Sequence, residues 1–312
     1  MSDKKYRLVT RSDFDGLVCA VLLKELDMID EIKFVHPKDM QDKIVEITEN
    51  DITTNLPYIE NCYLAFDHHK SEGERNKAVK KDNYILIPDA PSAARVVYDY
   101  YGGKEVFKNV SEEMMIAVDK ADSAQFIIDD VLVPKGWELL SFLMDARTGL
   151  GRFREFTISN YQLMMNLIDD CRNLPIEEIL NQPDVKERVD LYTMYQDKFE
   201  EQIMECSTLY NNLVVLDLRE EYIIYPGNRF VVYGLFPQCN VSIHRMWGQG
   251  KKKNVFAVGK SIFNKSSETD IGMLMLKYGG GGHPAAGTCQ IENEDADRVF
   301  EELIEALTEK KA

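Results

Sequence analysis

Two stretches of the chain combine carboxylates and imidazoles in an order that suits a divalent cation. In the first, the apolar run from Cys62 to Phe66 ends abruptly in Asp67, His68 and His69. Such an ending is typical of a buried parallel strand whose carboxyl end opens into a crevice, where open α/β sheets bind their ligands. Because side chains alternate faces along an extended chain, only one of the two histidines can face an ion, and the other must orient or support it. A surface pair of histidines that makes structural hydrogen bonds is the alternative.

The second stretch lies near the amino end, where a short strand turns through Asp13 and Asp15 into an apolar helix from Gly16 to Leu26. The turn brings two carboxylates and the first helix amides together. A divalent cation can therefore meet the acids while phosphate oxygens meet the positive helix end. Alone, this pattern is usually a structural turn. Together with the Asp-His-His strand end, it predicts a site for a metal ion and a phosphate.

A third motif is rich in glycine and runs from Tyr278 through four glycines and His283 to Gly287. With the two acidic motifs, it makes the chain resemble the DHH phosphoesterase family, in the branch that carries a C-terminal DHH-associated domain. That branch includes nanoRNases, pAp phosphatases, cyclic-dinucleotide phosphodiesterases and a single-strand-specific exonuclease. The matching motifs span nearly the whole chain apart from its middle.

The resemblance implies a centre of two metal ions, usually manganese, roughly 3.5 to 4 Å apart, which activate water and neutralise charge on the displaced group. It implies that Asp13 and Asp15 are metal ligands, that His68 is the metal-facing histidine and that His69 lies near the scissile phosphate. Asp67 is expected to hold the local structure around these ligands.

The resemblance also implies an acid from a fourth motif, and two residues are candidates for it. The spacing of Asp119 from the apolar run Ile116–Val118 favours Asp119 as the ligand. The segment from Asp122 to Phe126 also resembles the motif. Both acids therefore remain candidates, and Asp119 is preferred.

Two positions depart from the family pattern. Arg11 stands where the family has a histidine, and Asn55 is the best match for a bridging aspartate on the third strand. Both changes remove ligands mainly from one of the two metal positions. A guanidinium is permanently cationic and grips carboxylate or phosphate, but it cannot generate a hydroxide from bound water.

We therefore predict a variant centre with one Mn²⁺ or Mg²⁺ ion in place of two. Asp15, His68 and Asp119 would hold this ion, and Asn55 would offer a neutral carbonyl. Arg11 would pair with the other acid of the first turn or bind the substrate phosphate.

The glycine motif is expected to bind a ligand, with a flexible loop as the alternative. Consecutive glycines let the backbone come close to a bound molecule and adopt conformations denied to other residues. The resemblance implies that this loop holds the terminal nucleotide or phosphate of the substrate, with help from the preceding strands. The residues expected to take part are Gly280, Gly281, Gly282, His283, Arg245 and Ser261.

The 312 residues predict two folded domains joined by a helical connector. In residues 1–130, strands alternate with helices, which predicts an α/β domain with a doubly wound, mostly parallel sheet. Residues 131–211 carry apolar positions at helical spacing and are expected to form the connector. Strands return in residues 212–312, at 213–218, 230–235, 241–245 and 255–262, and predict a smaller α+β domain.

Composition excludes some classes of protein. With 53 acidic against 37 basic residues, the formal charge is −16. This argues against a protein that coats long duplex nucleic acids, since such binding depends on neutralising phosphates with Lys and Arg. The six cysteines contain no Cys-x-x-Cys pair and are expected to be free thiols in a reducing cytoplasm. No apolar run has the length of a membrane span, and no signal peptide is expected.

Two functional classes remain open. The first is a metal-dependent phosphoesterase that acts on short oligonucleotides, linear or cyclic dinucleotides or other small phosphates, with exopolyphosphatase-like activity as a further alternative. The second is a nucleotide sensor that kept the cleft and the glycine loop but lost hydrolysis. The acids and histidines of the first two motifs favour the enzyme, while Arg11 and Asn55 favour the sensor. The resemblance is also compatible with a homodimer.

Overall fold

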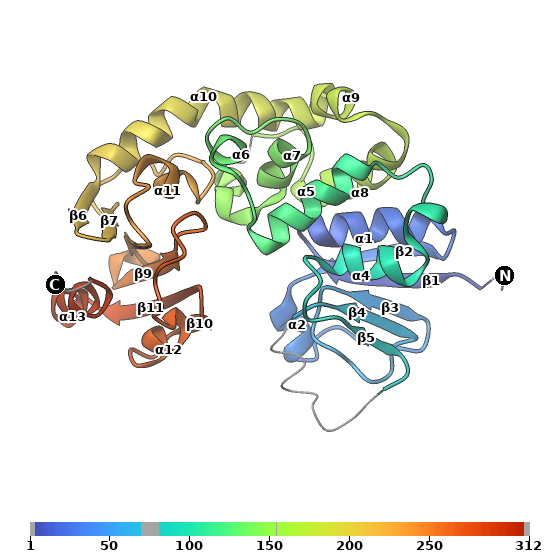
Figure 1. Ribbon diagram of the computed structural model, residues 1–312, viewed down its shortest axis with the longest axis horizontal. Helices are drawn as coiled ribbons and strands as arrows, with labels where there is room; N and C mark the ends of the chain where they lie inside the picture. The colour runs from blue at the N-terminus through green and yellow to red at the C-terminus, as the bar shows by residue number, and fades with distance from the viewer. Residues whose placement is uncertain (1–3, 70–80, 154, 309–312) are drawn as a thin grey trace. The chain divides into compact units, whose positions relative to one another are not determined.

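The computed structural model describes residues 4–69, 81–153 and 155–308, and the chain forms two compact units (Figure 1). Unit 1 comprises residues 1–126, 134–146 and 150–190, and unit 2 comprises residues 127–133, 147–149 and 191–312. The boundary at residue 190 lies inside the long helix α10 (Pro183–Glu205). The residues predicted as a helical connector are therefore divided between the two units.

Unit 1 is built on a five-stranded sheet with the strand order β2-β1-β3-β4-β5. Its neighbouring strands are all paired in parallel, which confirms the predicted fold class. Since β2 and β3 lie on opposite sides of β1, the sheet has a switch point beside the carboxyl end of β1, where open α/β sheets bind ligands. The strands are β1 (Tyr6–Arg11), β2 (Ile29–Val35), β3 (Asp51–Thr54), β4 (Leu64–Asp67) and β5 (Tyr84–Leu86).

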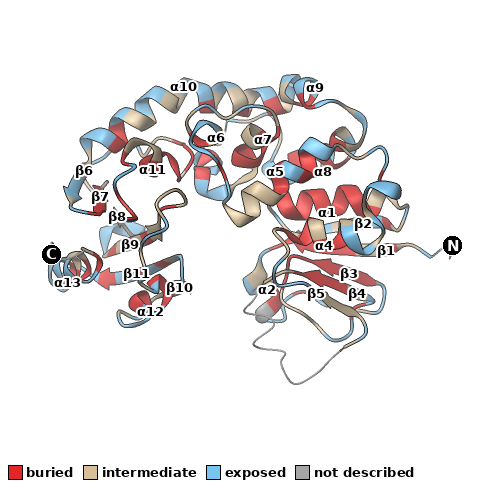
Figure 2. Cartoon of the chain, viewed as in Figure 1, coloured by how far each residue is buried: buried red, intermediate tan, exposed pale blue. Residues whose placement is uncertain are grey.

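Helices cover this sheet because parallel strands need both faces buried. The helix α1 (Phe14–Glu25) is almost wholly buried, as Figure 2 shows, and contacts α4 (Ala93–Tyr100), α5 (Glu112–Ser123) and α8 (Asn160–Asn173). Each of these four helices begins at a polar residue whose side chain accepts a first-turn N–H, a cap that contributes about 1 kcal/mol. The caps are Asp13, Ser92, Ser111 and Ser159. The other helices of this unit include α2 (Pro37–Gln41), α7 (Gly136–Met144) and α9 (Ile176–Asn181).

Unit 2 contains a six-stranded mixed sheet with the order β10-β11-β9-β8-β7-β6, in which only β7 and β8 are parallel among the described strands. Alternate strand residues such as Ile243, Phe256 and Ile291 form a core with α12 (Ile271–Leu276) and α13 (Ala296–Leu307). This α+β architecture confirms the prediction for the C-terminal part. The strands are β6 (Ser207–Tyr210), β7 (Leu213–Asp217), β8 (Val241–Trp247), β9 (Lys253–Lys260), β10 (Gly281–His283) and β11 (Ala286–Glu292).

One predicted strand, at residues 230–235, is wrong. Val231–Leu235 forms the short helix α11, which contacts α6 (Ile128–Leu132). Just before this helix, Asn228 forms a turn in which its Oδ1 accepts a hydrogen bond from Phe230 N at 2.9 Å. The β-branched and aromatic residues that suggested a strand are buried as helix side chains instead. Tertiary packing has overridden their strand propensity.

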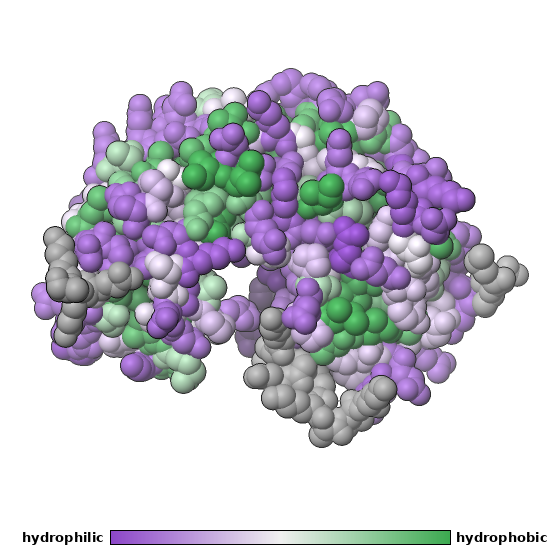
Figure 3. Space-filling view, viewed as in Figure 1, coloured by the Kyte–Doolittle hydropathy of each residue, from purple (hydrophilic) through white to green (hydrophobic). Residues whose placement is uncertain are grey.

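Polar residues dominate the face of the molecule in Figure 3, in line with a chain that is 29% charged. None of the helices in the described ranges combines the length and the hydropathy needed to cross a membrane. All six cysteines are unpaired thiols.

Candidate metal centre

The turn between β1 and α1 carries two acids, Asp13 and Asp15. Asp13 caps α1, because its Oδ1 accepts a hydrogen bond from Gly16 N at 3.0 Å. Gly16 makes this turn possible, since a Cβ there would lie 1.9 Å from the carbonyl oxygen of Arg11. Asp15 follows in the first turn of α1 and is only 2% exposed. The turn therefore places one carboxylate partly at the surface and the next in the interior.

A second helix holds the carboxylate of Asp15. Its Oδ2 accepts a hydrogen bond from Ala93 N at 3.0 Å and its Oδ1 one from Ala94 N at 2.7 Å, in the first turn of α4. These amides and the positive end of the helix dipole stabilise the charged form. Burial nevertheless raises the pKa of Asp15 to about 7, and the carboxylate of Asp122 adds to the rise. Burial therefore disfavours the charged form of Asp15 in spite of these two hydrogen bonds.

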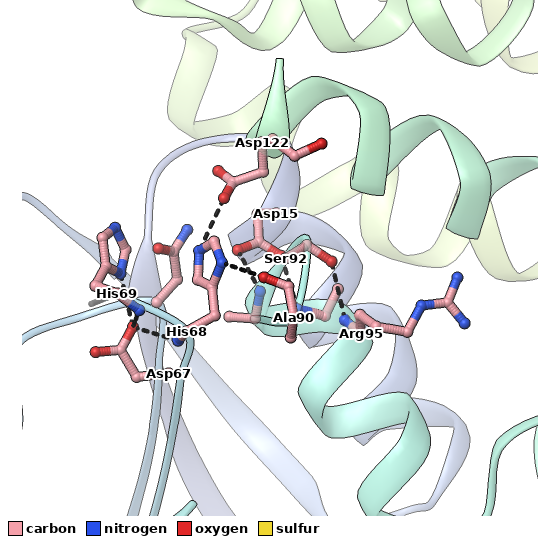
Figure 4. Close-up of polar contacts among 12 residues, drawn as sticks. Asp15, Asp67, His68, His69, Ala90, Ser92, Arg95 and Asp122 are labelled. Carbon is pink, nitrogen blue, oxygen red and sulfur yellow. Dashed lines mark hydrogen bonds and ion pairs between the residues drawn. The ribbon is translucent and has the colours of Figure 1, made fainter. Parts of the chain in front are cut away.

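His68 follows β4 and offers one ring nitrogen to the centre (Figure 4). Its Nδ1 lies 3.1 Å from the carbonyl oxygen of Ala90, and because a carbonyl only accepts, Nδ1 carries a proton. Nε2 lies 2.8 Å from Asp122 Oδ2, yet it is a buried atom without a partner of hydrogen-bond geometry among the described residues. Desolvation lowers the pKa of His68, but Asp122 and Asp15 raise it more, to about 9.

The third group of the centre is Asp122, in the last turn of α5. One ligand atom from each of Asp15, His68 and Asp122 lies within 4.8 Å of the other two. An imidazole and two carboxylates form a donor set that suits divalent cations, and carboxylates favour Mn²⁺ or Mg²⁺. Nε2 faces the Asp122 carboxylate, and Asp15 offers a second carboxylate nearby, so a bound cation would take the place of the proton on Nε2 and offset the charge of both acids. These three residues therefore fit a divalent metal ion.

Asp119, which the sequence favours as the fourth-motif ligand, lies elsewhere. Its Oδ1 accepts a hydrogen bond from Ser92 Oγ at 2.7 Å, and its Oδ2 accepts two from Arg95, at 3.0 Å from Nε and 2.6 Å from Nη2. Because α5 continues to Ser123, its last turn and not its middle reaches His68. The structure thus brings Asp122, and not Asp119, to the candidate ligands.

Asp13, Arg11 and Asn55 form a separate group beside this cluster. Arg11 Nε lies 2.8 Å from Asp13 Oδ2, and Asn55 Nδ2 donates a hydrogen bond to Asp13 Oδ1 at 3.2 Å. Asn55 follows β3 in a left-handed conformation with φ of 55°, which asparagine tolerates better than most residues. Its Oδ1 is a buried acceptor without a partner among the described residues. The Asp13 carboxylate therefore contacts Arg11, Asn55 and the backbone of Gly16.

Asp67 organises the turn that carries the two histidines. It is fully buried, and its Oδ1 accepts hydrogen bonds from His68 N at 2.8 Å and His69 N at 3.2 Å, while Tyr84 OH donates to its Oδ2 at 3.2 Å. His69 Nδ1 lies 2.7 Å from Asp67 Oδ1. Desolvation lowers the pKa of His69, but this contact raises it to a value above the ordinary one. Asp67 thus supports the turn, and His69 is oriented outside the cluster of candidate ligands.

In unit 2, close backbone packing requires two glycines of the third motif, Gly280 and Gly282. A Cβ on Gly280 would lie 2.0 Å from Thr288 O, and one on Gly282 would lie 2.2 Å from Ala286 O. Gly281 has open space around its Cβ position, and His283 is exposed. The hairpin of β10 and β11 therefore presents an accessible backbone edge at Gly281 and His283.

The other two residues predicted to help the glycine loop have structural partners. Arg245 is 3% exposed, donates to Asn254 Oδ1 at 3.1 Å and to Asp297 Oδ1 at 2.5 Å, and lies 4.6 Å from the ring centroid of Phe300. The Oγ of Ser261 accepts hydrogen bonds from the backbone of the two turn residues at 263 and 264. These contacts place Arg245 against α13 and Ser261 in a turn.

Sequence reasoning missed the residues of the segment from Ala90 to Ala94 that contact the centre. Ala90 and the amides of Ala93 and Ala94 act through the backbone, which leaves no side-chain signature. Ser92 carries the usual signature of a helix cap, and that signal was available in the sequence. Its contact with Asp119 arises only when α4 and α5 pack together.

Comparison with known proteins gives one strong likeness. No protein-family model matches the chain, and no curated protein matches it. Among solved structures, the pGpG-specific phosphodiesterase PggH from Vibrio cholerae is 63% identical, with a TM-score of 0.88 over 97% of this chain and 99% of that chain. Such identity over nearly the full length places the two chains in one family.

Other solved structures are more distant. CDC45 from Entamoeba histolytica is 10% identical over 98% of this chain and 96% of that chain, with a TM-score of 0.49. RecJ in complex with Mn²⁺ from Thermus thermophilus is 14% identical over 97% of this chain and 52% of that chain, with a TM-score of 0.42. Likenesses this weak support no conclusion about the site or its chemistry.

Proposed function

Because the chain belongs to the DHH family of metal-dependent phosphoesterases, we propose that it is a phosphodiesterase that hydrolyses small linear dinucleotides of the pGpG kind. The observation that supports this most directly is the cluster of Asp15, His68 and Asp122 at the carboxyl end of a parallel sheet. The substrate class rests on PggH, a pGpG-specific phosphodiesterase that shares 63% of its residues with this chain.

The protein would hold the cation with ligands that are already oriented. Mn²⁺ or Mg²⁺ bound to Asp15, His68 and Asp122 would supply Lewis-acid activation of the scissile phosphate and of the attacking water. The α4 amides fix both oxygens of Asp15, and Ala90 fixes the ring of His68 so that Nε2 is the nitrogen left for the ion. Oriented ligands of this kind lose little conformational freedom when the ion binds.

We propose further that each chain binds one cation. Arg11 places a permanent positive charge next to Asp13, where a second ion would otherwise be needed to balance that acid. The Arg11 side chain is 37% exposed, and a guanidinium has more N–H groups than this one contact uses. The remaining donors suit a non-bridging oxygen of the substrate phosphate.

His69 and the glycine hairpin are assigned to substrate binding. Asp67 holds His69 through Nδ1, so the Nε2 of the same ring remains to contact the phosphate or the leaving oxygen. In unit 2, the accessible backbone at Gly281 and the exposed His283 suit a terminal phosphate or nucleotide.

Hydrolysis of a substrate panel tests the function. The panel contains pGpG, other diribonucleotides, cyclic dinucleotides, pAp and polyphosphate, each with Mn²⁺, Mg²⁺ or a chelator. We expect turnover of pGpG with Mn²⁺, none with the chelator, and none for His68→Ala or Asp122→Ala. If the wild type binds pGpG but leaves it intact under all conditions, the chain is a sensor and the proposed activity is wrong.

We also propose that the protein works in a reducing cytoplasm, because all six of its cysteines are free thiols. A homodimer is expected from the family resemblance alone, and light scattering of the full chain would measure it.

A further inference from the structure

The segment from Ala90 to Ala94 contacts two of the three candidate ligands, His68 and Asp15 (Figure 4). A hydrogen bond from Ser92 to Asp119 also joins this segment to α5, the helix that carries the third ligand. We propose that Asp119 and Arg95, together with Ser92, are positioning residues that set the metal affinity of the centre by holding this segment in place. The inference rests on the proposed function, because it concerns the cation assigned to Asp15, His68 and Asp122.

The segment fixes His68 and Asp15 through backbone atoms. The carbonyl oxygen of Ala90 accepts the proton of His68 Nδ1, which selects Nε2 as the donor toward the ion. Three and four residues later, the amides of Ala93 and Ala94 each hold one oxygen of Asp15. A shift of this short stretch would therefore disturb the imidazole and the buried carboxylate together.

Ser92 lies in the middle of the segment and connects it to α5. It is completely buried, and its Oγ accepts the hydrogen bond of Arg95 N while donating to Asp119 Oδ1 at 2.7 Å. The hydroxyl thus caps α4 and binds the neighbouring helix at once. Both roles keep the first turn of α4, and with it the amides that hold Asp15, at a fixed distance from α5.

Arg95 completes this connection from the opposite side of Asp119. Its Nε and Nη2 both donate to Asp119 Oδ2, at 3.0 and 2.6 Å, in a partly buried ion pair whose side chains are 24% and 19% exposed. Protein donors therefore occupy both oxygens of Asp119, so it could not bind an ion without breaking this network. Asp119 precedes Asp122 by three residues on α5, and residues at this spacing are neighbours on one helix face.

These contacts make metal affinity depend on a residue that touches no ion. Without the Asp119 carboxylate, the Ser92 hydroxyl and the Arg95 guanidinium lose their partner, and the ligands held by the segment lose their relative placement. Loss of such a supporting partner typically weakens metal binding by about 10- to 100-fold. A purely structural ion pair would change stability but leave the affinity unchanged.

The chain offers a matched control for this distinction. Arg172 donates to Glu25 Oε2 through Nε at 3.3 Å and Nη2 at 3.0 Å, and the two side chains are 25% and 22% exposed. This pair is an arginine–carboxylate contact of similar burial in the same unit, between α1 and α8, and it contacts none of the candidate ligands. Glu25→Ala therefore reports the effect of losing an ion pair without disturbing the centre.

The test is a calorimetric titration of the full-length chain with Mn²⁺ alone, with thermal melting of each variant in parallel. We expect Asp119→Ala and Arg95→Ala each to raise the Mn²⁺ dissociation constant about 10- to 100-fold, and the double variant to be little worse than either, since the two act as one unit. The Mn²⁺ dissociation constant of Glu25→Ala should stay within about twofold of the wild-type value. Ser92→Ala, which removes one hydroxyl, gives the same comparison if Asp119→Ala does not fold.

The outcomes separate this inference from the proposed function. If wild type binds Mn²⁺ and Asp119→Ala or Ser92→Ala binds it within about twofold of wild type, the positioning role is overturned and the proposed function stands. The same role is overturned if Glu25→Ala weakens binding as much as Asp119→Ala. If wild type binds no Mn²⁺, both the metal centre and its positioning network are overturned.

Discussion

Replacement of Asp15 by asparagine should make the metal-free chain more stable while it abolishes metal binding. Asp15 is 2% exposed and lies near Asp122 and Asp13, so burial and these carboxylates raise its pKa to about 7. A carboxyl whose pKa is raised by folding binds its proton more tightly in the folded state than in the unfolded state. Its ionisation therefore weakens the fold as the pH rises from 3.8 toward 7, and the loss is complete above pH 7.

The size of the effect follows from that pKa. A rise from 3.8 to about 7 costs the folded state about 4 kcal/mol above pH 7, at about 1.4 kcal/mol per pKa unit. Asparagine keeps one carbonyl acceptor for the α4 amides but loses a charge-assisted hydrogen bond worth about 1.5 to 3 kcal/mol. The metal-free Asp15→Asn chain should therefore be more stable than wild type by about 1 to 2.5 kcal/mol.

Urea denaturation in EDTA, at a pH of about 8 and again at about 5, measures this difference in the free energy of unfolding. The extra stability of Asp15→Asn should appear at the higher pH and disappear at the lower pH. With saturating Mn²⁺ at high pH, the wild type should become more stable than Asp15→Asn, because only the wild type gains stability from the bound ion. Asp67→Asn is the matched control, since that buried carboxylate is satisfied by protein donors and its loss should destabilise the chain by about 1 to 3 kcal/mol. An Asp15→Asn chain less stable than wild type at both pH values would refute the reasoning.

Three further predictions concern the neighbouring group and the glycine hairpin. Arg11→Ala should lower kcat/KM for pGpG by about 10- to 150-fold, because a charge-assisted phosphate contact contributes about 1.5 to 3 kcal/mol. Calorimetry should show unchanged Mn²⁺ binding in this variant, and weaker binding would contradict the separate placement of Arg11. The double variant Arg11→His with Asn55→Asp should raise the Mn²⁺ content measured by native mass spectrometry from one ion to two, and an unchanged content would count against Arg11 as the substitute for a second ion. Gly280→Ala should cost about 1 to 3 kcal/mol in denaturation because its Cβ would lie 2.0 Å from Thr288 O, whereas Gly281→Ala, with open space, should be close to neutral; equal losses would contradict this packing.

The strand ends of the centre could be predicted from the sequence because each has a recognisable local pattern of apolar and acidic residues. An apolar run that stops at Asp67, His68 and His69 marks a buried strand, and Asp13 and Asp15 before an apolar run mark a strand-to-helix turn. In a parallel sheet these ends meet at one edge, so the structure brings Asp15 and His68 together as the sequence indicates.

The choice between Asp119 and Asp122 could not be made in this way. Both acids lie on α5, and which one faces His68 depends on where the helix ends and how it is rotated against α1 and α4. The network of Ser92 and Arg95 was missed for the same reason, since its contacts with Asp119 depend on how two successive helices pack against each other. The short helix at Val231–Leu235 shows the limit of propensity, because its residues favour strands and only burial against neighbouring elements decides.

The central claim is that Asp15, His68 and Asp122 bind one divalent cation. Calorimetric titration of the full-length chain with Mn²⁺ tests it most directly, because it gives the number of ions and the affinity without a substrate. We expect one ion per chain for the wild type and none for His68→Ala, which removes the nitrogen that Ala90 orients. Two ions per chain in the wild type, or undiminished binding in His68→Ala, would contradict it.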